Sequence, residues 1–201
     1  MTIKYFEYAS KEKEYLKERD PILGAAIDKI GMVEREIDRD IFSSLVSSII
    51  SQQVSTKSAI TVRDRLIELV GDIKPANINK IHIESIQKCG MSMRKAGYIK
   101  GIADAAISKE IDFDKLDNLS DEEVIKELTS LKGVGEWTAE MLLIHSLERP
   151  NILSFKDLGI RRGIMRLYGL ADISKKEFEV YRRRYSPHCT VASLYLWEIS
   201  M

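Results

Sequence analysis

A glycine hairpin and a later aspartate are the residues whose types and spacing point to chemistry. The stretch Leu131-Lys132-Gly133-Val134-Gly135 separates two segments with helical patterning, and Asp157 follows about twenty residues later. Glycine takes a positive φ at little cost, so Gly133 and Gly135 predict a very tight turn, with Val134 filling the gap between the helices. Such a turn directs backbone N–H groups outward beside a helix N-terminus, where they attract phosphate. Gly-x-Gly alone favours a plain corner between helices over a phosphate site.

Asp157 is predicted to be the N-cap of a helix, which is a common role for aspartate. The helix dipole and the N–H donors favour the ionised form, so we expect a carboxylate here at neutral pH. A fixed carboxylate can stabilise positive charge that develops on a sugar, and it can also orient or deprotonate a water. The residues do not separate these two roles.

The composition is that of a soluble globular protein. The chain has 201 residues, of which 44% are hydrophobic and 31% charged. No apolar stretch approaches the ~18 residues of a membrane span, and the Lys- and Glu-rich N-terminus has no apolar signal core. Two cysteines are too few for a disulfide framework or a cysteine-ligated cluster, so we expect a reducing cytosol.

The charge distribution bears on the partner. The net charge is zero, which argues weakly against nucleic acid, but binding depends on where the charges lie. Between Phe155 and Thr190 there are nine Lys or Arg residues and four acidic ones. By itself such a run is typical of a solvated helix face.

The hydropathy pattern predicts an all-α fold, because helical periodicity recurs and sustained apolar/polar alternation is absent. Ser120 and Glu123 form a predicted capping box, and Ser55 is a predicted N-cap. Residues 71–79 and 112–118 are predicted to be connections. The predicted helices cover residues 21–30, 42–51, 56–70, 83–88, 93–108, 121–131, 136–147, 157–167, 174–185 and 190–200.

The hairpin resembles that of the helix-hairpin-helix DNA glycosylase superfamily, whose pattern is Leu-x-Gly-[Val/Ile]-Gly-x-x-Thr-Ala. The string from Leu131 to Met141 reads Leu-Lys-Gly-Val-Gly-Glu-Trp-Thr-Ala-Glu-Met. The resemblance implies a two-lobed helical fold with a DNA groove between the lobes. It implies that the carbonyls of Leu131 and Gly133 hold Na⁺ or K⁺ bridging to a phosphate. The implied DNA-binding residues here are Lys132, Gly133, Val134, Gly135 and Thr138.

The resemblance extends to the segment from Leu153 to Arg162, where Asp157 stands at the family's catalytic position. Strand-cutting members carry a Lys two residues after the second hairpin glycine, where this chain has Trp137. Many also carry a four-cysteine iron–sulfur loop, which two cysteines cannot supply. The resemblance therefore implies a monofunctional glycosylase, without lyase activity, iron–sulfur cluster or any cofactor needed for chemistry.

Two tryptophans resemble those of the DNA-3-methyladenine glycosylase II group, in its short form without an N-terminal β domain. Trp137 and Trp197 would line the base pocket together with Met141, which replaces an aromatic of some relatives. An indole face attracts a cationic base by about 1–2 kcal/mol when desolvated. Without the resemblance, both tryptophans would be interpreted as ordinary core aromatics.

The stretch Ser51-Gln52-Gln53-Val54-Ser55 resembles the family's wedge loop, which fills the gap left by a flipped base. By position Gln53 would be inserted, and Gln52 would cap or support the loop. The alternative is a bent helix with a surface Gln pair. The segment from Met91 to Ala96 resembles another loop of the family, which runs near the DNA, so Arg94 and Lys95 are expected to contact phosphate. The three histidines show no metal-ligand spacing and are expected to be structural or surface residues.

These observations predict two lobes, residues 41–114 and residues 1–40 with 115–201. The expected function is excision of 3-methyladenine- or 7-methylguanine-type bases from double-stranded DNA by a monomer that contacts no membrane. The expected location is the cytoplasm, with the nucleoid in a bacterium or the nucleus in a eukaryote. Three alternatives stay open: a glycosylase for uracil, hypoxanthine, an etheno-adduct or 8-oxoguanine; a non-catalytic helix-hairpin-helix DNA-binding protein; and a helical scaffold.

Overall fold

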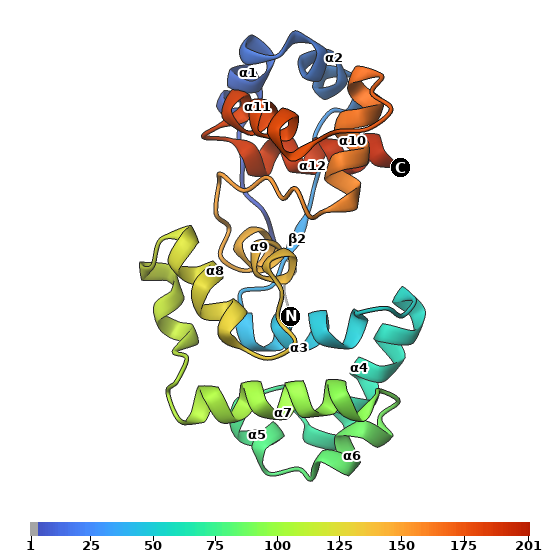
Figure 1. Cartoon of the computed structure of the whole chain (residues 1–201), viewed down its shortest axis with the longest axis vertical. Helices are drawn as coiled ribbons and strands as arrows, with labels where there is room; N and C mark the ends of the chain where they lie inside the picture. Colours follow the sequence, from blue (N-terminus) through green and yellow to red (C-terminus); the bar gives the residue numbers. More distant parts are fainter. Residues whose placement is uncertain (1–3) are drawn as a thin grey trace. The chain divides into compact units, whose positions relative to one another are not determined.

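The computed structural model describes residues 4–201 as a helical chain with one short two-stranded ribbon (Figure 1). The strands β1 (Lys4–Tyr5) and β2 (Glu36–Ile37) pair antiparallel. The helices are α1 (Ser10–Arg19), α2 (Pro21–Ile30), α3 (Ile41–Ser51), α4 (Thr56–Val70), α5 (Pro75–Asn79), α6 (Ile83–Lys88), α7 (Met93–Ile107), the 3₁₀ helix η1 (Phe113–Asn118), α8 (Asp121–Ser130), α9 (Glu136–His145), α10 (Leu158–Tyr168), α11 (Lys175–Tyr185) and α12 (Cys189–Ser200). The predicted all-α class is confirmed.

Contacts between Cα atoms divide the chain into two compact units. The central unit comprises Asp38–Leu142, and the terminal unit comprises the residues up to Ile37 together with Leu143–Met201. The first boundary falls near the predicted one at residue 40. The second lies at residue 142 and not at 114, so residues 115–142 belong with the central unit. One physical tie is the hydrogen bond from Gln52 Nε2 to the Gly133 carbonyl.

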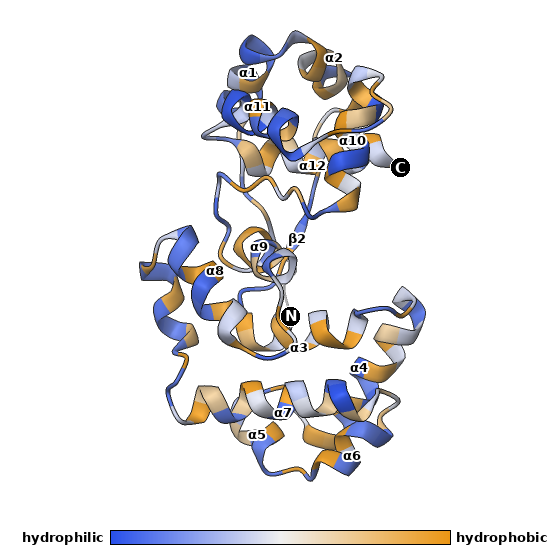
Figure 2. Ribbon diagram, viewed as in Figure 1, coloured by the Kyte–Doolittle hydropathy of each residue, from blue (hydrophilic) through white to orange (hydrophobic). Residues whose placement is uncertain are grey.

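In the terminal unit, α10 and α12 pack directly against each other and α2 covers both. The approach of α10 to α12 is close because Gly163 has no side chain: a Cβ there would lie 2.2 Å from the Leu196 carbonyl oxygen. Tyr185, Phe178 and Tyr195 are the largest fully buried side chains of this core. Figure 2 shows that α11, which supplies Phe178 and Tyr185 to this core, is otherwise largely hydrophilic.

A buried carboxylate joins three helices of the terminal unit. Asp20 caps α2 by accepting hydrogen bonds from the backbone N–H groups of Ile22 and Leu23. Its second oxygen accepts from Tyr168 Oη and from the Arg184 guanidinium, 2.6 Å away. Burial by itself raises the pKa of Asp20, but the hydrogen bonds from Tyr168, Arg184 and the Leu23 N–H, together with the Arg184 charge, outweigh it and hold the pKa below its ordinary value.

In the central unit, α7 packs against α5 and α6 on one side and contacts α3, which pairs with α4 (Figure 1). The apolar α3 buries Leu45, Val46 and Ile49 completely. Ser55 caps α4, and Ser120 with Glu123 forms the capping box of α8, as predicted.

Three local predictions need correction. Residues 71–79 are not wholly a loop, because Pro75 starts α5, where its fixed φ suits a first helical turn. Residues 112–118 form the 3₁₀ helix η1, whose Leu116 is buried. The β1–β2 ribbon was not predicted, because two-residue strands are too short to produce an alternating pattern.

The contact between α10 and α12 makes Gly163 sensitive to a single added carbon. We expect Gly163→Ala to lower the free energy of unfolding by about 3 kcal/mol, because the Cβ would overlap rigid backbone. The control is Gly101→Ala in α7, where a Cβ meets nothing within 4 Å. It should raise stability by about 0.5 kcal/mol through the unfolded state. Urea unfolding measures both, and equal stability of the two variants would contradict the packing.

Candidate functional site

The predicted hairpin forms a tight turn between α8 and α9. The Val134 N–H donates to the Leu131 carbonyl at 3.1 Å, and Val134 is buried, as a plug between helices requires. Gly133 has φ +89°, but Gly135 does not adopt a positive φ. Of the two glycines, only Gly133 therefore uses the positive φ that glycine allows. Lys132 and Gly135 are exposed at the N-terminal end of α9.

The first two turns of α9 carry the predicted pocket residues. Trp137 is 41% exposed, which is unusual for so large an aromatic side chain. Thr138 is buried, so its side chain does not reach the surface as a DNA contact, contrary to the prediction. Met141, one turn after Trp137, is buried. Trp137 is therefore the exposed aromatic that this helix presents.

The wedge-loop segment lies between α3 and α4 in the central unit. Gln53 is exposed and adopts φ +57°, which is uncommon for a residue other than glycine. The Gln52 side chain donates from Nε2 to the Gly133 carbonyl at 3.0 Å. Gln52 therefore supports the loop, as predicted, and does so by tying it to the hairpin.

Lys95 does not point outward as the prediction of a phosphate contact requires. Its Nζ donates to the Ile50 carbonyl at 2.8 Å and to the Gln52 carbonyl at 2.5 Å. Burial, and then the charge of Arg94, lower the pKa of Lys95. Arg94 is exposed and stays a candidate for phosphate binding.

Asp157 is the N-cap of α10, as predicted, and is 7% exposed. Its Oδ1 accepts two hydrogen bonds, from the Ile160 N–H at 2.8 Å and from the Trp197 indole Nε1 at 2.9 Å. The first bond fixes the carboxylate to its own helix, and the second fixes it to α12. An acid held by two elements keeps its orientation without rearrangement.

Gly159 makes the bond between Trp197 and Asp157 possible. A Cβ at position 159 would lie 2.8 Å from Trp197 Cδ1 and 3.1 Å from Asp157 Oδ1. The sequence carries a signal for this role. A glycine in the first turn of a helix lowers helix stability by about 1 kcal/mol and therefore suggests a packing reason.

His145 and Arg35 complete the surroundings of Trp197, and sequence reasoning missed both. The His145 ring stacks on the indole with centroids 5.6 Å apart and an interplanar angle of 21°. The Arg35 guanidinium lies over the same indole at 5.3 Å and is 3.4 Å from Glu198 Oε1. Nothing in the local pattern around Arg35 marks it, because its partners lie at the other end of the chain.

Burial and the nearby Arg35 charge lower the pKa of His145 to about 4, although the Asp157 charge acts in the opposite direction. The imidazole is consequently neutral near pH 7. A neutral ring can stack on Trp197 without adding charge beside Asp157. The sequence predicted a structural or surface role for His145, and its stacking on Trp197 corresponds to the first of these.

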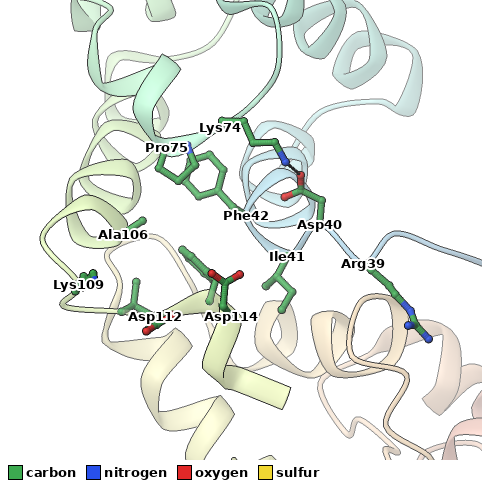
Figure 3. A pocket seen from close by; sticks show the side chains of 12 residues that line it. Arg39, Asp40, Ile41, Phe42, Lys74, Pro75, Ala106, Lys109, Asp112 and Asp114 are labelled. Carbon is green, nitrogen blue, oxygen red and sulfur yellow. Dashed lines mark hydrogen bonds and ion pairs between the residues drawn. The ribbon is translucent and has the colours of Figure 1, made fainter. Parts of the chain in front are cut away.

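The central unit also contains a cavity of about 630 Å³ that none of the predicted site residues lines. Figure 3 shows Phe42 and Pro75 on its wall, with the Lys74–Asp40 ion pair beside them. Both basic and acidic side chains line it, so the cavity has no single electrostatic preference.

Comparison with known proteins places this geometry in a family. The family model for the "HhH-GPD superfamily base excision DNA repair protein" matches residues 46–187, which include the wedge loop, the hairpin and Asp157. The chain belongs to the HhH-GPD superfamily. The resemblance inferred from the hairpin and the segment around Asp157 is thereby confirmed.

Individual relatives have consistent names. DNA-3-methyladenine glycosylase 1 of Schizosaccharomyces pombe is 35% identical over 167 residues, which span 81% of this chain and 73% of that protein. A crystal structure of a DNA-3-methyladenine glycosidase from Bacillus halodurans matches with a TM-score of 0.88 and 36% identity, covering 98% of this chain and 92% of that one. The S. pombe 3-methyladenine DNA glycosylase in complex with abasic DNA matches at TM-score 0.80 and 31% identity, covering 94% and 95%.

Among residues 4–201 no helix has the length and hydropathy that crossing a membrane would require.

The low pKa of His145 predicts an acid-sensitive terminal unit. The pKa of His145 falls from 6.5 to about 4 on folding. Its contribution to the free energy of unfolding is therefore fully present above pH 6.5 and is lost as the pH falls toward 4. Between pH 7.5 and pH 5.0 we expect it to account for about 2 kcal/mol of the lost unfolding free energy. In His145→Phe this loss should shrink by that amount.

Urea unfolding at the two pH values measures the difference. The control is His82→Phe, because His82 is exposed in the central unit, and this variant should keep the pH dependence of the wild type. An unchanged pH dependence in His145→Phe would contradict a buried neutral imidazole.

Proposed function

We propose that the protein is a monofunctional DNA glycosylase that hydrolyses the N-glycosidic bond of alkylated purines, of the 3-methyladenine and 7-methylguanine type, in double-stranded DNA. The observation that carries the proposal is the carboxylate of Asp157, buried and held by the α10 N-terminus and by Trp197. The names of the S. pombe and B. halodurans relatives support the substrate class.

The proposed chemistry starts with loss of the damaged base, which leaves positive charge on the deoxyribose. The Asp157 carboxylate stabilises that charge and positions the water that attacks the sugar carbon. The base leaves with the electrons of the N-glycosidic bond, the water oxygen forms the new bond to the sugar carbon and gives its proton to solvent, and an abasic sugar remains. An alkylated purine is cationic and leaves as a neutral base, so little general acid help is needed.

Trp137 is our candidate for the wall of the base pocket. Its indole is exposed, whereas the Trp197 ring already contacts His145 and Arg35. A desolvated indole face attracts a cationic purine by about 1–2 kcal/mol, which favours an alkylated base over a neutral one. We assign Met141 to the same pocket, and Trp197 to holding Asp157.

The DNA contacts that we propose lie in the central unit. The hairpin backbone around the exposed Lys132 and Gly135 binds a phosphate at the N-terminus of α9, and Arg94 adds charge. Gln53 enters the duplex when the damaged base leaves it, and its amide can hydrogen-bond to the orphaned base. The protein acts as a monomer on DNA in the cytoplasm or nucleus.

The implied Na⁺ or K⁺ fits the hairpin. The Leu131 carbonyl accepts from Val134 N–H and the Gly133 carbonyl accepts from Gln52 Nε2, and each carbonyl oxygen has a second lone pair. Leu131 and Gly133 can therefore hold the ion without losing either bond. The ion would supply charge for a DNA phosphate and take no part in the chemistry at the sugar.

We propose that the protein lacks lyase activity because Trp137 stands where strand-cutting members of the family carry a lysine. Strand cleavage through a Schiff base needs an amine at the reacting sugar, and an indole has none. Incubation of the protein with duplex DNA carrying 3-methyladenine or 7-methylguanine should release the free base and leave the strand intact until hot alkali cleaves the abasic site. Borohydride should trap no covalent complex.

Liquid chromatography of released bases and denaturing gels of the strands measure these outcomes, with duplexes carrying uracil or 8-oxoguanine as substrate controls. Release of uracil or 8-oxoguanine in preference to the methylated bases would overturn the substrate assignment. A borohydride-trapped complex would overturn the monofunctional one.

A further inference from the structure

The loop that carries Gln53 is weakly held by its own backbone. At the end of α3 the Gln52 N–H bonds the Ile49 carbonyl at 3.4 Å, and the Val54 N–H bonds the Ser51 carbonyl at 3.4 Å. Both distances lie at the long end for hydrogen bonds. Between them Gln53 adopts φ +57°, which costs about 1 kcal/mol for a residue with a Cβ. Groups outside the loop must keep it in this conformation.

Lys95 supplies that restraint from the first turn of α7. Its ammonium donates to the carbonyls of Ile50 and Gln52, which flank the C-terminus of α3. Terminal carbonyls lack partners within their own helix, and a cation there also benefits from the helix dipole. The Gln52 carbonyl belongs to the peptide that leads into Gln53. Lys95 therefore fixes the backbone next to the strained residue.

Tyr98, one turn along α7 from Lys95, meets the hairpin. A Cβ on Gly133 would lie 2.3 Å from Tyr98 Cδ2, so the hairpin backbone contacts the tyrosine ring directly. Residues three apart share one face of a helix. The same face of α7 thus touches the wedge loop through Lys95 and the hairpin through Tyr98.

The hydrogen bond from Gln52 to the Gly133 carbonyl joins the loop to the hairpin directly. The wedge loop, the hairpin and α7 are consequently linked pairwise within the central unit. A phosphate bound at the hairpin then lies at a fixed distance from Gln53.

We propose that Lys95 is a positioning residue for base flipping, which acts by holding Gln53 in place and not by binding a DNA phosphate. The proposal rests on the proposed function, because it presumes that Gln53 enters the duplex. It goes beyond that function in assigning the coupling between phosphate binding and insertion to one partly buried ammonium group, that of Lys95.

The chain offers a closely matched control in Lys100. This lysine also lies on α7, and its Nζ donates to the carbonyls of Ile78 and Asn79 at the end of α5. Lys100→Met therefore removes the same kind of lysine–carbonyl link at a helix end that carries no predicted site residue. Lys95→Met and Lys100→Met should lose similar stability, so a difference in activity reports on position.

The test measures single-turnover excision at saturating protein on a duplex with one methylated purine. We expect Lys95→Met to slow excision by a factor of about 10–100, because an unanchored loop inserts Gln53 poorly, while Lys100→Met stays within threefold of wild type. Arg94→Met should weaken DNA affinity and its salt dependence. Lys95→Arg, which keeps a cationic donor, should recover most of the rate.

A double-mutant cycle identifies the route of the effect. If Lys95 acts through Gln53, then adding Lys95→Met to the Gln53→Ala variant should slow excision by less than a further threefold. The fluorescence of 2-aminopurine beside an abasic site should rise on binding of wild type and less with Lys95→Met, which reports insertion without excision.

Additive effects of Lys95→Met and Gln53→Ala on the excision rate would overturn the proposal. It would also be overturned if Lys95→Met lost DNA affinity and salt dependence, as expected for Arg94→Met, while its excision rate stayed at the wild-type value. Should Lys95→Met fail to fold, Lys95→Gln replaces it, with the same expected order. If wild type released no methylated base, the proposed function would fail. The fluorescence comparison would still decide the proposal for Lys95.

Discussion

The hydrogen bond from Trp197 Nε1 to Asp157 Oδ1 joins α12 to the N-terminus of α10, and the terminal unit is built around that junction. It requires glycine at position 159, where a Cβ would overlap the indole, and glycine at position 163, where a Cβ would overlap the α12 backbone. His145 then stacks on the indole as a neutral ring because its pKa is lowered by burial. Gly159, Gly163 and His145 thus all help to hold the Asp157 carboxylate in place.

In the central unit, the hairpin and the wedge loop must be held in a fixed arrangement. A phosphate-binding turn and a wedge loop are both short and irregular, and irregular segments are held by few bonds of their own. Here α7 and the Gln52 amide hold them. Lys95, which the sequence suggested for DNA contact, instead donates hydrogen bonds to backbone carbonyls of the protein, whereas Arg94 beside it is exposed. Adjacent basic residues therefore have different roles.

Much of this structure could be predicted from the sequence, because its signals are local. Ser55, Ser120 and Asp157 cap the helices where predicted, since capping depends on a few neighbouring residues. The roles of His145 and Arg35 could not be predicted, because they depend on Trp197, which is far away in the chain. The unit boundary at residue 142 was missed for a similar reason: the link from the hairpin to Gln52 spans 81 positions.

The most direct test of a carboxylate fixed by Trp197 is the single-turnover rate of 3-methyladenine release at saturating protein for Asp157→Asn and Trp197→Phe. We predict a fall of about 10²–10³-fold for the first, which removes the charge, and about tenfold or more for the second, which removes the indole donor. DNA affinity should stay within threefold of wild type, and Asp172→Asn, an exposed aspartate of the same unit, should excise normally. Excision by Asp157→Asn at the wild-type rate would contradict the assignment of the chemistry to this carboxylate.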